Sequence, residues 1–199
     1  MVVFLKQKFI TNMSVYDKYY KTENLFGEPY PELIQFFSAY PTRGKLLDLG
    51  CGQGRDAIAL AKLGYEVTGI DHSSVGINQM VRRAKEDNLQ LSGLTTDIYA
   101  YDKINEFDFI LLDSMFHFEK TDKVKEIAFL EKILTQMMPD ALLVVCIQDT
   151  GKKVEILNKT IRDHTSSDYL VNQKLTYVFT DDETGHQSVT DYRMIALKK

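Results

Sequence analysis

The fold of this chain is indicated by one stretch at positions 46–56, which reads LLDLGCGQGRD. Its apolar first half predicts a short buried strand over 45–49, and its three glycines predict a tight turn that leads into a helix. A turn without side chains lets a ligand approach the backbone, and the start of the helix offers unpaired N–H groups and a positive dipole end. The stretch therefore predicts a ligand-binding turn at the end of a strand.

Two cofactor classes bind to glycine turns of this kind, and the spacing of the glycines separates them. A dinucleotide site uses G-x-G-x-x-G, with the start of the helix facing a pyrophosphate. Here the glycines follow G-x-G-x-G, and Asp48 stands two residues before Gly50. A carboxylate at Asp48 would repel a pyrophosphate but would suit a ligand that carries an ammonium group. The turn therefore favours S-adenosylmethionine over NAD.

Strands and helices alternate along most of the chain. Strands are expected near residues 66–70, 91–95, 107–113 and 141–148, and helices near residues 57–63, 73–88, 122–137 and 152–164. Two further strand-like runs, 169–179 and 188–197, meet across the acidic turn 181–185 and predict a hairpin. The pattern predicts an α/β, Rossmann-like, doubly wound fold. It has a seven-stranded, mostly parallel sheet, a C-terminal antiparallel hairpin and helices on both faces.

Two more acids follow strands of the predicted sheet. Asp71 ends the second strand, 17 residues after Gly54, where a carboxylate can bind both hydroxyls of a ribose. Asp97 comes just after the third strand, where it could meet an adenine amino group. All of these acids lie at the carboxyl ends of parallel strands, which is where open α/β sheets bind ligands.

The composition is that of an ordinary globular domain. The chain has 199 residues, of which 44% are hydrophobic and 26% are charged. We expect residues 1–13 to form a mobile extension and residues 14–199 to form a single domain. Within it, a segment at 14–40 is expected to be a helical lid capped by Ser14.

Charge and cysteine content narrow the class of protein further. A net charge of −4 argues against a protein that binds nucleic acid by bulk charge. The longest apolar run is too short to cross a bilayer, and the start of the chain is unlike a signal peptide. Two distant cysteines are typical of reduced thiols. We therefore expect a cytoplasmic protein without a nucleic-acid or membrane partner.

These motifs resemble those of class I S-adenosylmethionine-dependent methyltransferases. The resemblance rests on D-x-G-x-G-x-G at 48–54, GIDHS at 69–73, TDI at 96–98 and FDFILLD at 107–113. It covers about residues 14–199. The segment GQGR at 52–55 and the closing strand pair resemble the small-molecule branch that includes tellurite-resistance and thiol methyltransferases. The sequence PDA at 139–141 departs from the family's Pro-Gly-Gly, which affects only a surface turn.

The resemblance implies a role for each residue of these motifs. Asp48 and the carbonyls around Gly50, Cys51 and Gly52 would receive the ammonium group of the cofactor's methionine part. A second set would hold the nucleoside: Asp71 the ribose, His72 the adenine face, and Asp97 with Ile98 the adenine edge. Leu112 would lie beside the methionine part. Asp48 could equally hold the loop by hydrogen bonds, and Asp97 could be a helix cap.

Four residues remain open between a functional and a structural role. His117 follows the fourth strand and could accept a proton or only shape the pocket. Tyr16 and Tyr20 lie on the segment that in the family folds over the cofactor, but an aromatic cluster at helical spacing also packs. Arg55 could bind an acidic substrate or pair with a neighbouring acid.

The leading hypothesis is therefore methyl transfer from S-adenosylmethionine to a small molecule by in-line displacement, with S-adenosylhomocysteine as the product. The sulfonium is already an activated donor, so alignment supplies most of the catalysis and a metal is not required. The alternatives are a non-catalytic S-adenosylmethionine-binding partner or sensor, a protein-modifying methyltransferase and a nicotinamide-dependent oxidoreductase. The chain is expected to be a monomer or a homodimer, since the hairpin could pair at its edge.

Overall fold

The structure is a computed structural model that describes residues 15–180 and 187–199, without the side chains of residues 15, 16, 179 and 180. The expected extension at 1–13, the cap Ser14 and the turn at 181–185 lie outside the described residues.

Fifteen helices and strands make up the described chain. The helical elements are the 3₁₀ helices η1 (Val15–Lys21), η2 (Ile98–Ala100) and η3 (Ile104–Glu106) and the α-helices α1 (Pro31–Ala39), α2 (Arg55–Lys62), α3 (Ser74–Glu86), α4 (Lys123–Gln136) and α5 (Lys152–His164). The strands are β1 (Lys45–Leu49), β2 (Glu66–Asp71), β3 (Leu91–Thr95), β4 (Phe109–Asp113), β5 (Leu142–Gln148), β6 (Tyr169–Thr180) and β7 (Gln187–Lys198). Each strand and helix expected from the sequence is present, with ends that differ by a few residues at most.

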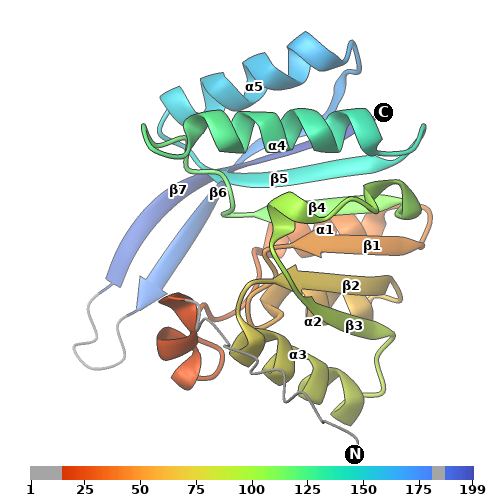
Figure 1. The fold of residues 1–199 in the computed structure, drawn as a ribbon, viewed down its shortest axis with the longest axis vertical. Coiled ribbons are helices and arrows are strands. Elements are labelled where there is room, and N and C mark those ends of the chain that lie inside the picture. Colours follow the sequence, from red (N-terminus) through yellow and green to blue (C-terminus); the bar gives the residue numbers. More distant parts are fainter. Residues whose placement is uncertain (1–14, 181–186) are drawn as a thin grey trace, which may run out of the picture.

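One seven-stranded sheet with the order β3-β2-β1-β4-β5-β7-β6 forms the centre of the molecule (Figure 1). The strands β1 to β5 pair in parallel, and β7 runs antiparallel to both β5 and β6. This confirms the predicted fold class. The order also places β7 between β5 and β6.

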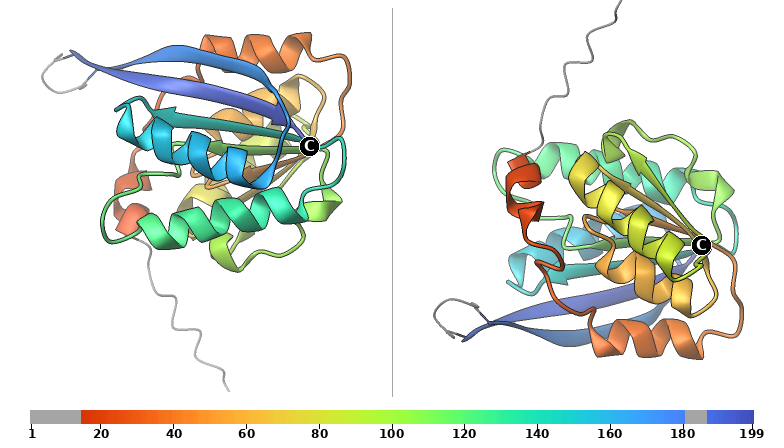
Figure 2. Two further views of the ribbon diagram at one scale, coloured as in Figure 1. Left: turned by 90° about the horizontal axis from the view of Figure 1, so that it is seen from above. Right: turned by 90° about the horizontal axis from the view of Figure 1, so that it is seen from below.

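Helices cover both faces of the sheet, with α1, α2 and α3 on one face and α4 and α5 on the other (Figure 2). The strand β4 shows why its sequence is apolar throughout: successive side chains point to opposite faces, and both faces are buried. Ile110 and Leu112 pack with α4 and α5, while Phe109 and Leu111 pack with α1 and α2. Within the described residues, the helices are all too short or too polar to cross a membrane.

The hairpin of β6 and β7 extends beyond the rest of the sheet. β7 pairs with β5 only from Tyr192 to Lys198, so its first residues pair with β6 alone. The projecting part lies on the same side as η1 (Figure 1). The hydroxyl of Tyr177 on β6 donates a hydrogen bond to the carbonyl oxygen of Phe26 at 3.2 Å. The hairpin therefore contacts the segment that follows η1.

The first described element of the expected helical lid is a 3₁₀ helix, η1. Its Asp17 is buried and accepts a hydrogen bond from the hydroxyl of Ser73 at 2.5 Å. Ser73 is also the N-cap of α3, since its hydroxyl accepts a hydrogen bond from the N–H of Gly76. This contact ties η1, the first part of residues 15–30, which we call the cap segment, to the link between β2 and α3.

Candidate functional site

The glycine turn has a backbone that only glycine adopts easily. Gly50, Gly52 and Gly54 have φ angles of +85°, +54° and +83°, in the left-handed region. A Cβ atom at Gly52 would lie 2.6 Å from the hydroxyl of Tyr20. The N–H groups of Gly50 and Cys51 both donate to the carbonyl of Ile70, at 2.8 and 3.1 Å. The turn is therefore fixed against β2, with no space for side chains.

A cavity of about 760 Å³ opens beside this turn, at the carboxyl ends of β1, β2 and β4. Tyr20, Phe26 and Tyr30 of the cap segment line it, together with Tyr177 and Tyr192 of the hairpin. The structure brings most of the predicted site residues together there: Tyr20, Asp48, Gly50, Cys51, Gly52, Arg55, Asp71, His72, Ile98 and His117.

Asp97 and Leu112 stand apart from that group. Asp97 caps η2 by accepting a hydrogen bond from the N–H of Tyr99, and it lies 3.5 Å from Nε2 of His72. Leu112 is fully buried in the core under α4, and the cavity is lined instead by the residues that follow it, Asp113 to Met115. Because successive side chains of a strand point to opposite faces of the sheet, Leu112 points toward α4. The side chain of Tyr16 lies outside the described residues.

Asp48 is a buried carboxyl group without enough hydrogen-bond partners. Its side chain lines the cavity, the residue is 2% exposed, and no described residue hydrogen-bonds its Oδ2 atom. Burial raises the pKa of Asp48 well above its usual range, and the neighbouring carboxylate of Asp56 raises it further. The arrangement therefore fits a cationic N–H donor. Such a donor would supply the missing hydrogen bond and place a positive charge beside the carboxyl group.

Asp71 connects the turn to the start of α3. Its Oδ2 accepts a hydrogen bond from the N–H of Gly52 at 3.0 Å, and its Oδ1 accepts one from the N–H of Ser73 at 2.7 Å. These bonds orient a half-buried carboxylate that lines the cavity at the end of β2. A carboxylate so placed can accept further hydrogen bonds from ligand hydroxyl groups.

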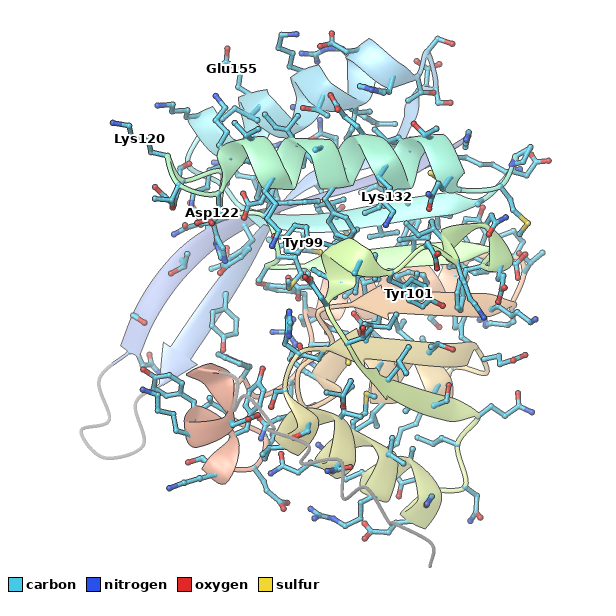
Figure 3. All side chains as sticks on the ribbon, in the orientation of Figure 1. Tyr99, Tyr101, Lys120, Asp122, Lys132 and Glu155 are labelled. Carbon is cyan, nitrogen blue, oxygen red and sulfur yellow. The ribbon has the colours of Figure 1, made fainter. Side chains whose placement is uncertain are left out.

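The rim at Ile98 and Tyr99 is held by α4. The Nζ atom of Lys132 donates hydrogen bonds to the carbonyl oxygens of Tyr99 and Tyr101, at 3.1 and 2.5 Å (Figure 3). The Nζ atom of Lys125 lies 3.6 Å from the centroid of the Tyr99 ring. The element that follows β3 is thereby fixed along this side of the cavity.

Arg55 pairs with neighbouring acids, which is one of the two roles left open for it. Its Nε and Nη2 atoms donate to the two carboxylate oxygens of Asp56, at 3.1 and 2.9 Å, and Nη2 also pairs with Asp113. Its guanidinium carbon lies 5.2 Å from the ring centroid of Tyr30. Burial would lower the pKa of Arg55, but the Asp56 carboxylate together with the hydroxyl groups of Tyr30 and Tyr177 outweighs burial, so the pKa is raised.

Sequence reasoning missed several lining residues at this end of the cavity. Asp56 follows Arg55 directly and Asp113 ends β4, so both could have been singled out from the same motifs. Tyr30, Tyr177 and Tyr192 carried no such signal. They come from distant segments, and their rings meet only in the folded chain.

His117 lies exposed at the rim of the cavity. Its N–H donates to the carboxylate of Glu126 on α4, at 3.1 and 3.2 Å, and the N–H of Phe118 donates to the same carboxylate. Glu126 is only 2% exposed. The loop it holds has positive φ angles at both ends, +58° at Ser114 and +49° at Phe118. A buried side chain therefore holds this rim loop in an uncommon conformation.

Comparison with known proteins identifies the family. Residues 9–173 match the family described as "Tellurite resistance protein TehB". This chain belongs to the TehB family. One relative of this TehB-family chain, from Haemophilus influenzae (strain 10810), is named "Probable S-adenosyl-L-methionine-dependent methyltransferase TehB". It is 39% identical over 83 residues, which cover 42% of this chain and 29% of the relative.

Another relative is the ubiquinone biosynthesis O-methyltransferase of Rickettsia conorii. It is 26% identical over 121 residues, which cover 60% of this chain and 40% of the relative. The TehB-family chain thus matches less than half the length of either of these two curated relatives.

Solved structures share the fold of this TehB-family chain. The crystal structure of TehB from Haemophilus influenzae has a TM-score of 0.66 at 20% identity, covering 92% of this chain and 65% of that one. A structure reported as "Conversion of a Disulfide Bond into a Thioacetal Group during Echinomycin Biosynthesis" reaches 0.75 at 20% identity, covering 93% and 91%. Magnesium protoporphyrin IX methyltransferase of Synechocystis, solved with bound SAM, has a TM-score of 0.66 at 16% identity, covering 84% and 76%. The chain therefore has the class I methyltransferase fold.

Proposed function

We propose that this TehB-family chain transfers a methyl group from S-adenosylmethionine to a small-molecule acceptor in the cytoplasm. The observation that carries the proposal is Asp48, a buried carboxyl beside the glycine turn with one oxygen that no described residue hydrogen-bonds. That oxygen suits an ammonium group, which S-adenosylmethionine carries. The family and the fold support the same reaction.

The residues of the cavity fit the other parts of the cofactor as well. Asp71 would accept hydrogen bonds from the ribose hydroxyls, His72 would lie against the adenine face, and Asp97 with Ile98 would meet the adenine edge. Leu112 would contribute only from the core beneath the site, since Asp113 and the residues after it line the cavity.

The chain would contribute to catalysis by aligning the reactants and by excluding water. S-adenosylmethionine, when bound, supplies a methyl group activated by a sulfonium charge. The rigid turn would fix the donor, the aromatic cap and hairpin would exclude water, and the acceptor would be held in line with the methyl carbon. His117 at the rim would take a proton from acceptors that arrive protonated.

Partial enclosure of the cavity favours a small acceptor over a protein. The cap segment and the hairpin both line the cavity, and the hydrogen bond from Tyr177 to Phe26 joins them. A peptide segment would have to enter between these two elements. A protein-modifying enzyme and a non-catalytic binding domain are the outcomes that the test below separates from this proposal.

The first experiment measures cofactor binding by calorimetry. We expect S-adenosylhomocysteine to bind and NAD not to bind. Gly52→Val should abolish binding, because a branched side chain would fill the space beside Tyr20. Gly151→Val is the matched control: Gly151 also has a positive φ, of +71°, but an added Cβ would meet no atom within 4 Å. Tight binding by folded Gly52→Val would show that the cofactor lies elsewhere.

The second experiment follows tritiated methyl transfer into a cell extract split by filtration into small molecules and proteins. Label in the small-molecule fraction is expected, and it should disappear with Gly52→Val. Label confined to the protein fraction would indicate a protein-modifying enzyme, and binding without transfer would indicate a sensor.

A further inference from the structure

The cavity beyond the glycine turn has aromatic walls. The rings of Tyr30, Tyr177 and Tyr192 contact one another, with centroids 6.0, 5.6 and 6.3 Å apart. The guanidinium of Arg55 already lies against the ring of Tyr30, so this wall holds one planar cation. Tyr177 and Tyr192 are half-buried and line the same cavity. Their ring faces suit a second cation.

Negative charge exceeds positive charge at this end of the cavity. Arg55 is bound by the two buried carboxylates of Asp56 and Asp113. One cation against two carboxylates leaves a local charge of 1 − 2 = −1. Charges in such a partly buried site are screened much less than on the surface. An anionic acceptor would therefore be repelled, and a cationic one attracted.

Asp48 adds a further carboxyl group to the lining of the cavity. Asp48 is buried and its Oδ2 lacks a hydrogen-bond donor among the described residues. Carboxyl groups therefore line the cavity from β1, α2 and β4, through Asp48, Asp56 and Asp113. The proposed cofactor brings an ammonium group, which would pair with Asp48, and its sulfonium and carboxylate charges offset each other. The excess negative charge at Asp56 and Asp113 is therefore left for the acceptor.

We propose that the methyl acceptor is an amine, bound as its ammonium cation near Tyr177, Tyr192 and Asp113. This inference rests on the proposed methyl transfer. It disfavours oxyanions as acceptors, although the family takes its description from tellurite resistance.

The chemistry balances without a further reactant. The bound ammonium loses one proton to water at the rim, where His117 is exposed. The nitrogen lone pair then forms a bond to the methyl carbon while the carbon–sulfur bond breaks. The electron pair of that bond stays on sulfur, giving S-adenosylhomocysteine, and the positive charge passes to the methylated nitrogen.

The test uses three small ligands of one shape and three charges: phenethylamine, 2-phenylethanol and phenylacetate. Their binding to the full chain saturated with S-adenosylhomocysteine is measured by calorimetry at about pH 7.5, where the amine is a cation. The amine should bind at least about ten-fold more tightly than the alcohol, by attraction to the carboxylates and ring faces. Phenylacetate and tellurite should bind more weakly than the alcohol.

Two variants and a control locate the effect. Asp113→Asn keeps the shape of the side chain and removes its charge, so it should reduce the preference for the amine about ten-fold. Tyr192→Leu should weaken binding of the amine more than binding of the alcohol, because the aromatic ring face is lost. Glu155→Gln is the control: this carboxylate is exposed on α5 and points away from the sheet (Figure 3).

The outcomes separate this inference from the proposed function. Equal binding of the three ligands, or tighter binding of phenylacetate or tellurite, would overturn the proposal that the acceptor is an amine. The proposal of methyl transfer would be unaffected. A preference for the amine that survives in both Asp113→Asn and Tyr192→Leu would also overturn it. Failure of S-adenosylhomocysteine to bind, which is measured first, would overturn both proposals.

Discussion

Asp71 shows how one residue can serve the fold and the proposed ligand together. It orients the glycine turn and the start of α3 through the N–H groups of Gly52 and Ser73. We predict that Asp71→Asn weakens binding of S-adenosylhomocysteine by about 2–3 kcal/mol, since hydrogen bonds to a charged group contribute about that much. Calorimetry measures the affinity, and the melting temperature of the ligand-free variant reports the structural part. An unchanged affinity would exclude Asp71 from ribose binding.

Asp48 should make cofactor binding depend on pH. Burial raises the pKa of Asp48 in the free protein, whereas a bound ammonium group would favour the carboxylate and lower it. Binding would then release a proton, so affinity should rise as pH increases between the lowered and the raised pKa. Calorimetry in two buffers of different ionisation enthalpy measures the released proton. Asp48→Asn should abolish the release, and a wild-type protein that releases none would contradict the assignment.

At the scale of elements, α4 holds the loop that carries His117. Removing the carboxylate in Glu126→Ala would leave two N–H groups without their acceptor, at a cost of about 1–3 kcal/mol each. We predict a lower melting temperature and slower turnover, with the affinity for S-adenosylhomocysteine little changed. Glu126→Gln keeps one acceptor oxygen, so its melting temperature and its turnover should fall less than those of Glu126→Ala. Glu131→Ala, on the same helix but half-exposed, is the control.

Equal melting temperatures for Glu126→Ala and Glu131→Ala would show that the rim loop is held by its own packing. The stacked rings of Phe116 and Phe118, 5.4 Å apart, are the contact that could do so.

At the scale of the whole molecule, Gln53 joins the cap segment to the glycine turn. Its Oε1 accepts from the N–H of Leu25 at 3.0 Å, and its Nε2 donates to the carbonyl of Thr22 and to Gln79, at 2.8 and 2.7 Å. We predict that Gln53→Ala loosens the cap and weakens cofactor binding by about 1–2 kcal/mol, since water would enter the cavity. Hydrogen exchange over residues 15–30 and calorimetry check the two effects.

The outcome that would contradict this prediction is faster exchange in the cap with an unchanged cofactor affinity. The cap would then be packing alone, and the tyrosines that line the cavity from it would have no part in holding the ligand.

The sequence by itself determined the elements and the side of the cavity that the glycine turn forms. The glycines at 50, 52 and 54 permit the left-handed backbone of the turn, and apolar runs of strand length predict burial on both faces. Asp48 and Asp71 could be predicted because they lie within or beside these local motifs. Parallel strands also bring their carboxyl ends to one edge, so residues far apart in sequence were expected to meet there.

Only the tertiary structure decided the other side of the cavity. The pairing of Arg55 with Asp113 joins residues 58 positions apart, and Tyr30 meets Tyr192 because β7 lies between β5 and β6. The alternation of β4 turned Leu112 into the core and left Asp113 at the cavity. Such contacts depend on how whole elements pack and on charges brought together by that packing. Local periodicity and motif spacing do not specify which of these side chains pair with each other.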